Sequence, residues 1–253
     1  MMNYRLTPAV KTILFLSLGL FVFQQVMDRW LGGHVLSVLG LRPSGFLIHF
    51  HVWQIFTYSL LHGDVTHLVL NALMLVVIGS ELEMVWGTAK FVRYYLASII
   101  FAGFSYIILQ LIFWQPDSLA IPLIGASGGV YGLLVAYGIL FSERTLLFMM
   151  LFPMKAKVFV WVLAGVEFFT TVFTPGGGLS GIAHLGGMLG GFLFLLLSVF
   201  LKQRITGLKR MAKSKGKAPH LKLVVTNTKT PKKDFLNQLF KQGDSRNDPK
   251  TWH

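Results

Sequence analysis

Polar side chains that could do chemistry occur in three short segments of an otherwise strongly apolar chain. The first contains His62, His67 and Asn71, the second contains Ser127 in the stretch GASGGVYG, and the third contains His184 in GIAHLGGMLGG. A serine becomes a nucleophile when a base lies within hydrogen-bonding reach, and neutral imidazole is the natural base near neutral pH. Acyl transfer also needs N–H donors that stabilise the developing oxyanion. These residue types therefore predict acyl transfer, with Ser127 as nucleophile and His184 as base.

Helical spacing assigns roles to the neighbours of this pair. His67 and Asn71 are four residues apart and share one face of a helix, so both can supply side-chain N–H donors to an oxyanion hole. The backbone N–H of Ser127 can add a further donor. Tyr131 follows Ser127 by four residues and is a candidate to stack on the imidazole of His184. The sequence places no acid to orient His184, so we expect a Ser–His dyad in which Tyr131 takes the orienting role.

Glycines are concentrated around Ser127 and His184. Twelve of the 26 glycines lie in residues 125–132 and 176–191. Small residues spaced four apart let two membrane helices approach until their backbones touch. We therefore expect the helices that carry Ser127 and His184 to pack together. The glycines expected at helix contacts are Gly125, Gly128, Gly132, Gly187 and Gly191.

The elements that must position these residues are membrane-spanning helices. The chain has 253 residues, of which 54% are hydrophobic and 13% charged, and its mean hydropathy is +0.62, whereas a water-soluble domain carries about 25% charged residues. A bilayer core takes about 20 mostly apolar residues per helix. The segments that meet or approach this length are 12–27, 65–80, 94–113, 121–141, 158–173 and 179–201. We therefore predict an all-α, polytopic membrane bundle of six transmembrane helices.

Lys and Arg are divided unequally between the two sides of this bundle. The side that holds both termini carries 21 of them, and the opposite side carries 2. Because positively charged connections stay in the cytoplasm, we expect both termini to be cytoplasmic, in the inner or plasma membrane if the chain is bacterial. The two histidines of the first segment, Ser127 and His184 then lie near the outer ends of their helices, with Ser127 about two turns below the outer surface.

The chain divides into an apolar body, residues 1–201, and a basic tail, residues 202–253, which carries 14 of the 23 Lys and Arg. We expect the tail to be a largely flexible cytoplasmic segment. Its basic residues either contact anionic lipid headgroups, at about 1 kcal/mol per basic residue near the surface, or act only as a signal for membrane topology. The body has no basic face, so no nucleic-acid partner is expected. The lack of cysteine excludes disulfides and thiolate chemistry, and no metal or cofactor is predicted.

Three further features bear on the fold. The connection 28–63 is too apolar for a solvated loop, and we expect it to pack on the bundle at the outer interface. Residues 146–153 are also apolar, and they either extend the fourth helix or rest on the inner interface. Glu167 lies within the fifth span, where a carboxylate is costly. We expect it to have a structural partner rather than a catalytic role.

At these residues the sequence closely resembles the rhomboid family of intramembrane serine proteases. The matching segments are HGDVTHLVLN at 62–71, GASGGVYG at 125–132 and GIAHLGGMLGG at 181–191, with a Gly79–Glu83–Gly87 spacing after the second helix. Where the family often has Trp-Arg in the first outer loop, this chain has Trp53-Gln54. That departure puts in doubt any anchoring of the loop that depends on the arginine.

The resemblance implies an activity and a role for each matching residue. Family members cut transmembrane segments of other membrane proteins near the outer surface. Ser127 would be the nucleophile and His184 the general base. The implied supporting residues are His67 and Asn71 in the oxyanion hole, His62 assisting them, and Tyr131 packed on the base.

Two other interpretations remain open. A catalytically silent rhomboid-like protein would bind or escort membrane clients, and relatives of that kind often lack the Ser or His that this chain retains. A His-ligated haem or metal protein could use His62, His67 and His184, but it would leave the GASGGVYG stretch unexplained. Zinc and aspartyl intramembrane proteases are excluded, because the chain has no HExxH motif and no Asp within the predicted spans.

Overall fold

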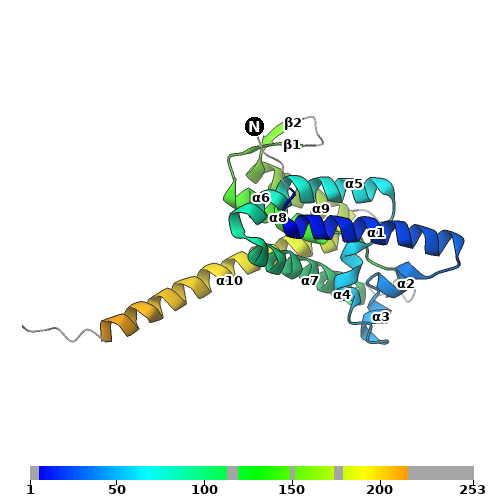
Figure 1. Ribbon diagram of the computed structural model, residues 1–253, viewed down its shortest axis with the longest axis horizontal. Coiled ribbons are helices and arrows are strands. Elements are labelled where there is room, and N and C mark those ends of the chain that lie inside the picture. Colours follow the sequence, from blue (N-terminus) through cyan, green and yellow to red (C-terminus); the bar gives the residue numbers. More distant parts are fainter. Residues whose placement is uncertain (1–5, 113–118, 149–151, 174–178, 216–253) are drawn as a thin grey trace, which may run out of the picture. The chain divides into compact units, whose positions relative to one another are not determined.

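The computed structural model describes residues 6–112, 119–148, 152–173 and 179–215, and these are almost entirely helical (Figure 1). The elements, in chain order, are α1 (Pro8–Trp30), α2 (Val35–Leu39), α3 (Pro43–Leu47), α4 (Gln54–Thr57), a 3-10 turn η1 (Tyr58–Leu60), α5 (Val65–Met74), a π-helical turn η2 (Leu75–Gly79), α6 (Ser80–Trp86), α7 (Thr88–Ile112), α8 (Ser127–Leu140), β1 (Thr145–Phe148), β2 (Phe152–Lys155), α9 (Ala156–Phe173) and α10 (Leu179–Lys215).

Among the described residues, five helices are long and apolar enough to cross a membrane, and one apolar helix is shorter. The long ones are α1, the continuous stretch Val65–Trp86, α7, α9 and the part of α10 from Ser180 to Thr206; the shorter one is α8, with 14 residues. The chain is therefore a polytopic membrane bundle. The predicted fourth span, 121–141, began too early: residues before Ser127 pair with the connection 28–63, through a two-bond bridge between Leu123 and Leu41.

The second span also differs from its predicted end at residue 80. It continues through η2 and α6 to Trp86, and Gly87 ends it with a φ of +77°. Two acidic residues, Glu81 and Glu83, lie in this extension, and both have partners. Glu81 accepts a hydrogen bond from Tyr137 (2.7 Å) and pairs with Arg144, while Glu83 is buried.

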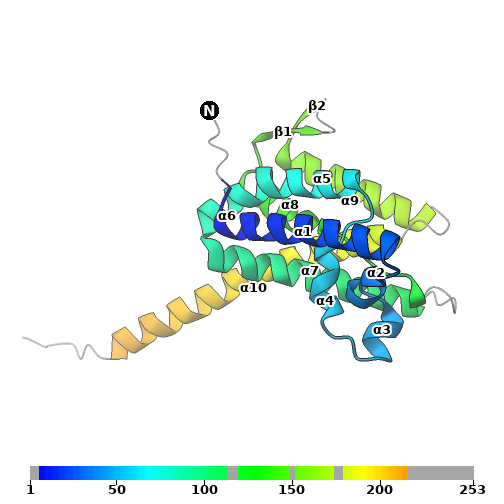
Figure 2. The same cartoon turned by 45° about the vertical axis from the view of Figure 1, so that its right-hand side comes forward.

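Glu83 joins the second span to the start of α1. Its carboxylate accepts hydrogen bonds from the backbone N–H groups of Ala9 (2.9 Å) and Val10 (3.1 Å) and from the hydroxyls of Thr7 (2.5 Å) and Thr88 (2.7 Å). The first N–H groups of a helix have no acceptor within the helix. The carboxylate supplies that acceptor, so α1 is held beside α5 and α7, as Figures 1 and 2 show.

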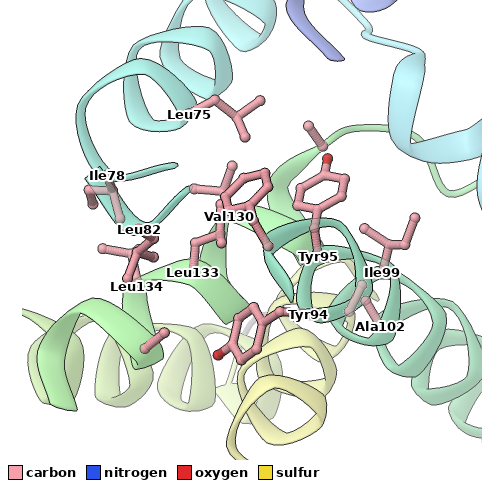
Figure 3. Packing of buried hydrophobic residues seen from close by; sticks show 14 of the residues in the cluster. Leu75, Ile78, Leu82, Tyr94, Tyr95, Ile99, Ala102, Val130, Leu133 and Leu134 are labelled. Carbon is pink, nitrogen blue, oxygen red and sulfur yellow. The ribbon is translucent and has the colours of Figure 1, made fainter. Parts of the chain in front are cut away.

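The core is centred on α8, which is buried on every side: ten of its 14 residues are buried. A helix that is apolar all round belongs in the interior of a bundle. Side chains from the second span, α7 and α8 meet in this core, as Figure 3 shows for Leu75, Ile78, Leu82, Tyr94, Tyr95, Ile99, Ala102, Val130, Leu133 and Leu134.

The connection between α1 and the second span packs on the bundle, as predicted, and Leu41 within it is fully buried. Gln54, also fully buried, anchors it: Oε1 accepts from the N–H of Arg42 (3.1 Å), and Nε2 donates to the carbonyls of Ser37 (3.3 Å) and Val38 (3.1 Å). A glutamine therefore ties the loop together at the position where the family often has an arginine.

The segment 146–153 does not extend the fourth helix, so the first of its two predicted alternatives is wrong, and a place at the inner interface stays a prediction. α8 ends at Leu140, and an antiparallel hairpin follows in which Leu146 lies opposite Met154 and Leu147 opposite Pro153. Pro153 has no N–H for a helix, but both strands of a two-stranded ribbon are edges and tolerate it. The fold is thus helical with one small hairpin rather than purely α.

The last helix passes the predicted boundary between body and tail. α10 continues without a break from residue 201 to Lys215. The rest of the basic tail, 216–253, lies outside the described residues. The flexibility expected of that segment therefore stays a prediction.

Candidate active site

Ser127 and His184 face each other although they are 57 residues apart in the sequence. Ser127 is the first residue of α8, and His184 lies in the second turn of α10. Nε2 of His184 is 2.8 Å from Oγ of Ser127, which is hydrogen-bonding distance. A nucleophile and a base in such contact are the minimum that serine-based acyl transfer requires.

The two helices meet because glycines remove side chains from their contact. A Cβ at Gly187 would clash with the carbonyl oxygen of Gly128, and one at Gly191 would clash with the hydroxyl of Tyr94 and lie 3.2 Å from Cα of Gly132. The backbones of α8 and α10 therefore touch directly, as the glycine spacing predicts. Since Gly128 follows Ser127 and Gly187 lies one turn after His184, this contact sets the separation of the two side chains.

Gly125 has a different role from the one predicted. It lies in the loop before α8, with a φ of +117°, and is not part of a helix contact. A Cβ there would lie 2.7 Å from the imidazole of His67, so the glycine makes room for that ring beside Ser127. Gly129, four residues later, faces Tyr95 and Ile99 of α7.

Tyr131 stacks on the base. The rings of Tyr131 and His184 are nearly parallel, with centroids 4.2 Å apart and planes inclined by 4°. This is the placement that the four-residue spacing from Ser127 predicts. The ring covers one face of the imidazole and restricts its rotation.

An acid does reach His184, contrary to the sequence-based expectation. Oε1 of Glu167, on α9, lies 3.0 Å from Nδ1 of His184, and the hydroxyl of Tyr131 donates a hydrogen bond to the same oxygen. Spacing along α9 cannot show which helix Glu167 faces, so its partner was missed. The available signal was its cost, since an intramembrane carboxylate is a functional candidate by default.

His67 and Asn71 lie on α5, in the element next to the Ser127 loop. Asn71 is buried, and its Nδ2 donates to the carbonyl of His67 (2.9 Å). An amide nitrogen carries two hydrogens, so one remains for another acceptor. The backbone N–H groups of the first turn of α8 have no acceptor within that helix. Of these groups, the imidazole of His67 and the first-turn N–H groups of α8 lie near Ser127, since a Cβ at Gly125 would lie 2.7 Å from that imidazole and 3.6 Å from Oγ of Ser127.

His62 is buried beside His67. It is 1% exposed, and its ring lies edge-on to that of His67, with centroids 5.1 Å apart. Its carbonyl accepts a hydrogen bond from Gln24 of α1 (3.0 Å). Burial, reinforced by the nearby His67, lowers the pKa of His62 from 6.5 to about 4. His62 is therefore neutral near pH 7 and supports the ring of His67.

Comparison with known proteins gives one family. Residues 49–200, which include every candidate site residue, match the Rhomboid domain. RHOMBOID-like protein 1 of Arabidopsis thaliana is 32% identical over 188 residues, covering 70% of this chain and 43% of that protein. Rhomboid protease GluP of Bacillus subtilis is 26% identical over 183 residues, covering 72% of this chain and 33% of that protein.

A third relative is matched over more of its own length. Putative rhomboid protease YdcA of Bacillus subtilis is 30% identical over 158 residues, covering 60% of this chain and 70% of that protein. The chain spans less than half the length of the other two relatives. The similarity thus concerns the helical body that contains the candidate site.

Proposed function

The chain belongs to the rhomboid family, and we propose that it is an intramembrane serine endopeptidase that hydrolyses peptide bonds in or near transmembrane segments of other membrane proteins. The observation that carries this proposal is the 2.8 Å contact between Oγ of Ser127 and Nε2 of His184. The contact lies inside a polytopic membrane bundle, so the substrates within reach are themselves membrane proteins.

The first half of the reaction is acylation of Ser127. Oγ attacks the scissile carbonyl carbon while its proton moves to Nε2 of His184, and the carbonyl oxygen becomes an oxyanion. Side-chain N–H groups of His67 and Asn71 and the backbone N–H of Ser127 would stabilise that charge. His184 then gives the proton to the leaving amine, the C–N bond breaks, and an acyl-enzyme remains on Ser127.

Water completes the cycle. His184 takes a proton from water as its oxygen attacks the ester carbonyl, and the proton returns to Oγ of Ser127 when the carboxylic acid product leaves. A transmembrane substrate hides its carbonyls in helical hydrogen bonds. Substrates with glycine or proline near the cleavage site unwind at lower cost, and we expect these to be preferred.

The orientation in the membrane is part of the proposal. Both termini would be cytoplasmic, because Lys and Arg are concentrated on their side of the bundle. Ser127 would then act near the opposite surface, and the basic tail would lie at the cytoplasmic face, where it can contact anionic lipids. For a bacterial chain the membrane would be the inner membrane.

A fluorophosphonate probe tests the proposal directly. Purified protein in detergent would be labelled as wild type, Ser127→Ala, His184→Ala and, as a control serine on the hairpin side, Ser142→Ala. We expect labelling of the wild type and Ser142→Ala and loss of labelling in the other two, with all four equally folded by thermal unfolding. A folded wild type without labelling would contradict the proposal and favour a catalytically silent rhomboid-like protein.

A further inference from the structure

We propose that Glu167 is the acid of a Ser–His–Glu unit, a positioning residue that acts on the substrate only through His184. This inference rests on the proposed function and replaces its dyad by a triad. It starts from one contact: Oε1 of Glu167 lies 3.0 Å from Nδ1 of His184, on the opposite side of the ring from the Ser127 contact.

Two contacts of the carboxylate converge on the base. The hydroxyl of Tyr131 donates to the same Oε1 that faces His184, while the ring of Tyr131 stacks on that imidazole. Three side chains from α8, α9 and α10 therefore form one closed cluster around Nδ1. The side chains of Glu167 and His184 are only 14% and 16% exposed, and a charge so buried is costly unless it is paired.

The chemistry of imidazole explains how the contact between Glu167 and His184 can assist the reaction. Nε2 can accept the Ser127 proton only if the neutral ring carries its hydrogen on Nδ1, which is the nitrogen that Glu167 faces. When the proton moves from Oγ to Nε2, the ring becomes a cation beside a carboxylate. Glu167 stabilises that cation and takes no proton itself.

The contact between Glu167 and His184 is short, but it is not an aligned hydrogen bond. Among the described residues, Nδ1 of His184 has no aligned acceptor, although Oε1 of Glu167 lies at 3.0 Å. Catalytic hydrogen bonds of a resting enzyme often become aligned only when the reaction begins. A small rotation of either side chain brings the N–H onto the carboxylate.

A structural alternative is that Glu167 merely holds α9 against α10. The buried residues of α9, Ala156 and Phe159, both lie in its first turn. Farther along, Gly181 of α10 accommodates Glu167, since a Cβ there would lie 3.0 Å from Oε2. A glutamine could hold the helices together with the same shape and no buried charge. The alternative therefore predicts that Glu167→Gln keeps its activity, whereas the triad predicts that it does not.

The test compares inactivation kinetics of the full chain by a fluorophosphonate, with the maximal rate constant and the half-saturating concentration measured separately. We expect Glu167→Gln to lower the maximal rate about ten- to a hundredfold without changing the half-saturating concentration or the thermal midpoint. Glu167→Asp, which keeps the charge, should retain more of the rate than Glu167→Gln. Glu143→Gln, which removes an exposed acid of the hairpin region, is the matched control and should behave as the wild type.

A double-mutant cycle tests the part of Tyr131. Tyr131→Phe keeps the ring that stacks on His184 and removes the hydroxyl that binds Glu167. If the hydroxyl acts through Glu167, its removal slows the wild type but has no further effect in the Glu167→Gln variant. Additive effects of the two substitutions would contradict this coupling.

The outcomes separate the inference from the proposed function. A wild-type maximal rate in folded Glu167→Gln, with Ser127→Ala unlabelled, would overturn the inference and leave the protease proposal standing. Equal losses of the maximal rate in folded Glu167→Asp and Glu167→Gln would also overturn it, because the charge would then be irrelevant.

An unlabelled but folded wild type would overturn both the inference and the protease proposal. Should the variants fail to fold, nitrogen and proton NMR of histidine-labelled wild type decides: an Nδ1 hydrogen of His184 that is hydrogen-bonded supports the triad, and one that is not hydrogen-bonded, or a hydrogen on Nε2 instead, contradicts it.

Discussion

The backbone of Gly187 on α10 packs directly against the carbonyl of Gly128 on α8. These glycines adjoin the residues whose side chains must meet, since Gly128 follows Ser127 and Gly187 lies one turn after His184. The approach of the two backbones thus determines whether the 2.8 Å contact between Oγ and Nε2 can form. Stability of the bundle and assembly of the candidate site depend on the same atoms.

Gly187→Ala is therefore expected to lower both stability and labelling. A methyl group at this position clashes with backbone, which cannot move aside as a flexible side chain can, and overpacking typically costs about 1–3 kcal/mol. The matched control is Gly165→Ala on α9, where a Cβ would meet nothing within 4 Å. It should be neutral or slightly stabilising, because alanine is the better helix former. Thermal unfolding and probe labelling of both variants check this, and equal midpoints would contradict the contact.

Replacing Glu83 should loosen α1. Glu83→Gln exchanges one acceptor oxygen for a donor nitrogen among four groups that all donate to the carboxylate. Hydrogen bonds to charged groups contribute about 1.5–3 kcal/mol, so we expect a clear fall in the thermal midpoint. Glu143→Gln is the control, since its pairs with Lys155 and Lys157 are exposed and contribute little. Equal midpoints for the two variants would refute the role of Glu83.

Gln54→Leu tests whether Gln54 anchors the connection 28–63. The substitution keeps the approximate size of a fully buried side chain but removes its three hydrogen bonds to loop backbone. Backbone groups left without partners cost about 1–3 kcal/mol, so the variant should unfold at a lower temperature. The exposed Gln203→Leu on α10 is the comparison, for which no such loss is expected. Faster proteolysis within 28–63 would locate the effect.

Acid should weaken the fold through His62. Its pKa is about 4 in the folded protein, below the value of 6.5 for a free histidine, so the unfolded chain binds a proton at a higher pH than the folded one. Stability contributed by His62 is complete above pH 6.5 and declines as pH falls toward 4, by at most about 3 kcal/mol. His62→Leu should therefore show a shallower loss over this window than the wild type. His34→Leu, at an exposed site, should retain the wild-type dependence; identical profiles for all three proteins would contradict the prediction.

The apolar spans and the pairing of Ser127 with His184 could be predicted from local patterns of residues. Hydrophobicity and helix length are local properties, so the five long spans could be placed from composition, with errors at their ends. The glycines around the two residues are also a local signal, because a helix face of glycines lets a neighbouring helix approach closely. With Tyr131 four residues after Ser127, the stacked ring followed from helical periodicity alone.

Contacts between side chains of different helices became visible in the folded structure alone. Helical spacing shows which residues share a face of one helix, but not how far that helix is rotated toward each neighbour. Glu167 was therefore visible as a costly carboxylate, while its contact with His184 was not. Likewise Gly125 fitted a helical spacing, but its positive φ and the imidazole of His67 place it in a loop. Both depend on packing between segments far apart in the chain, which no local pattern encodes.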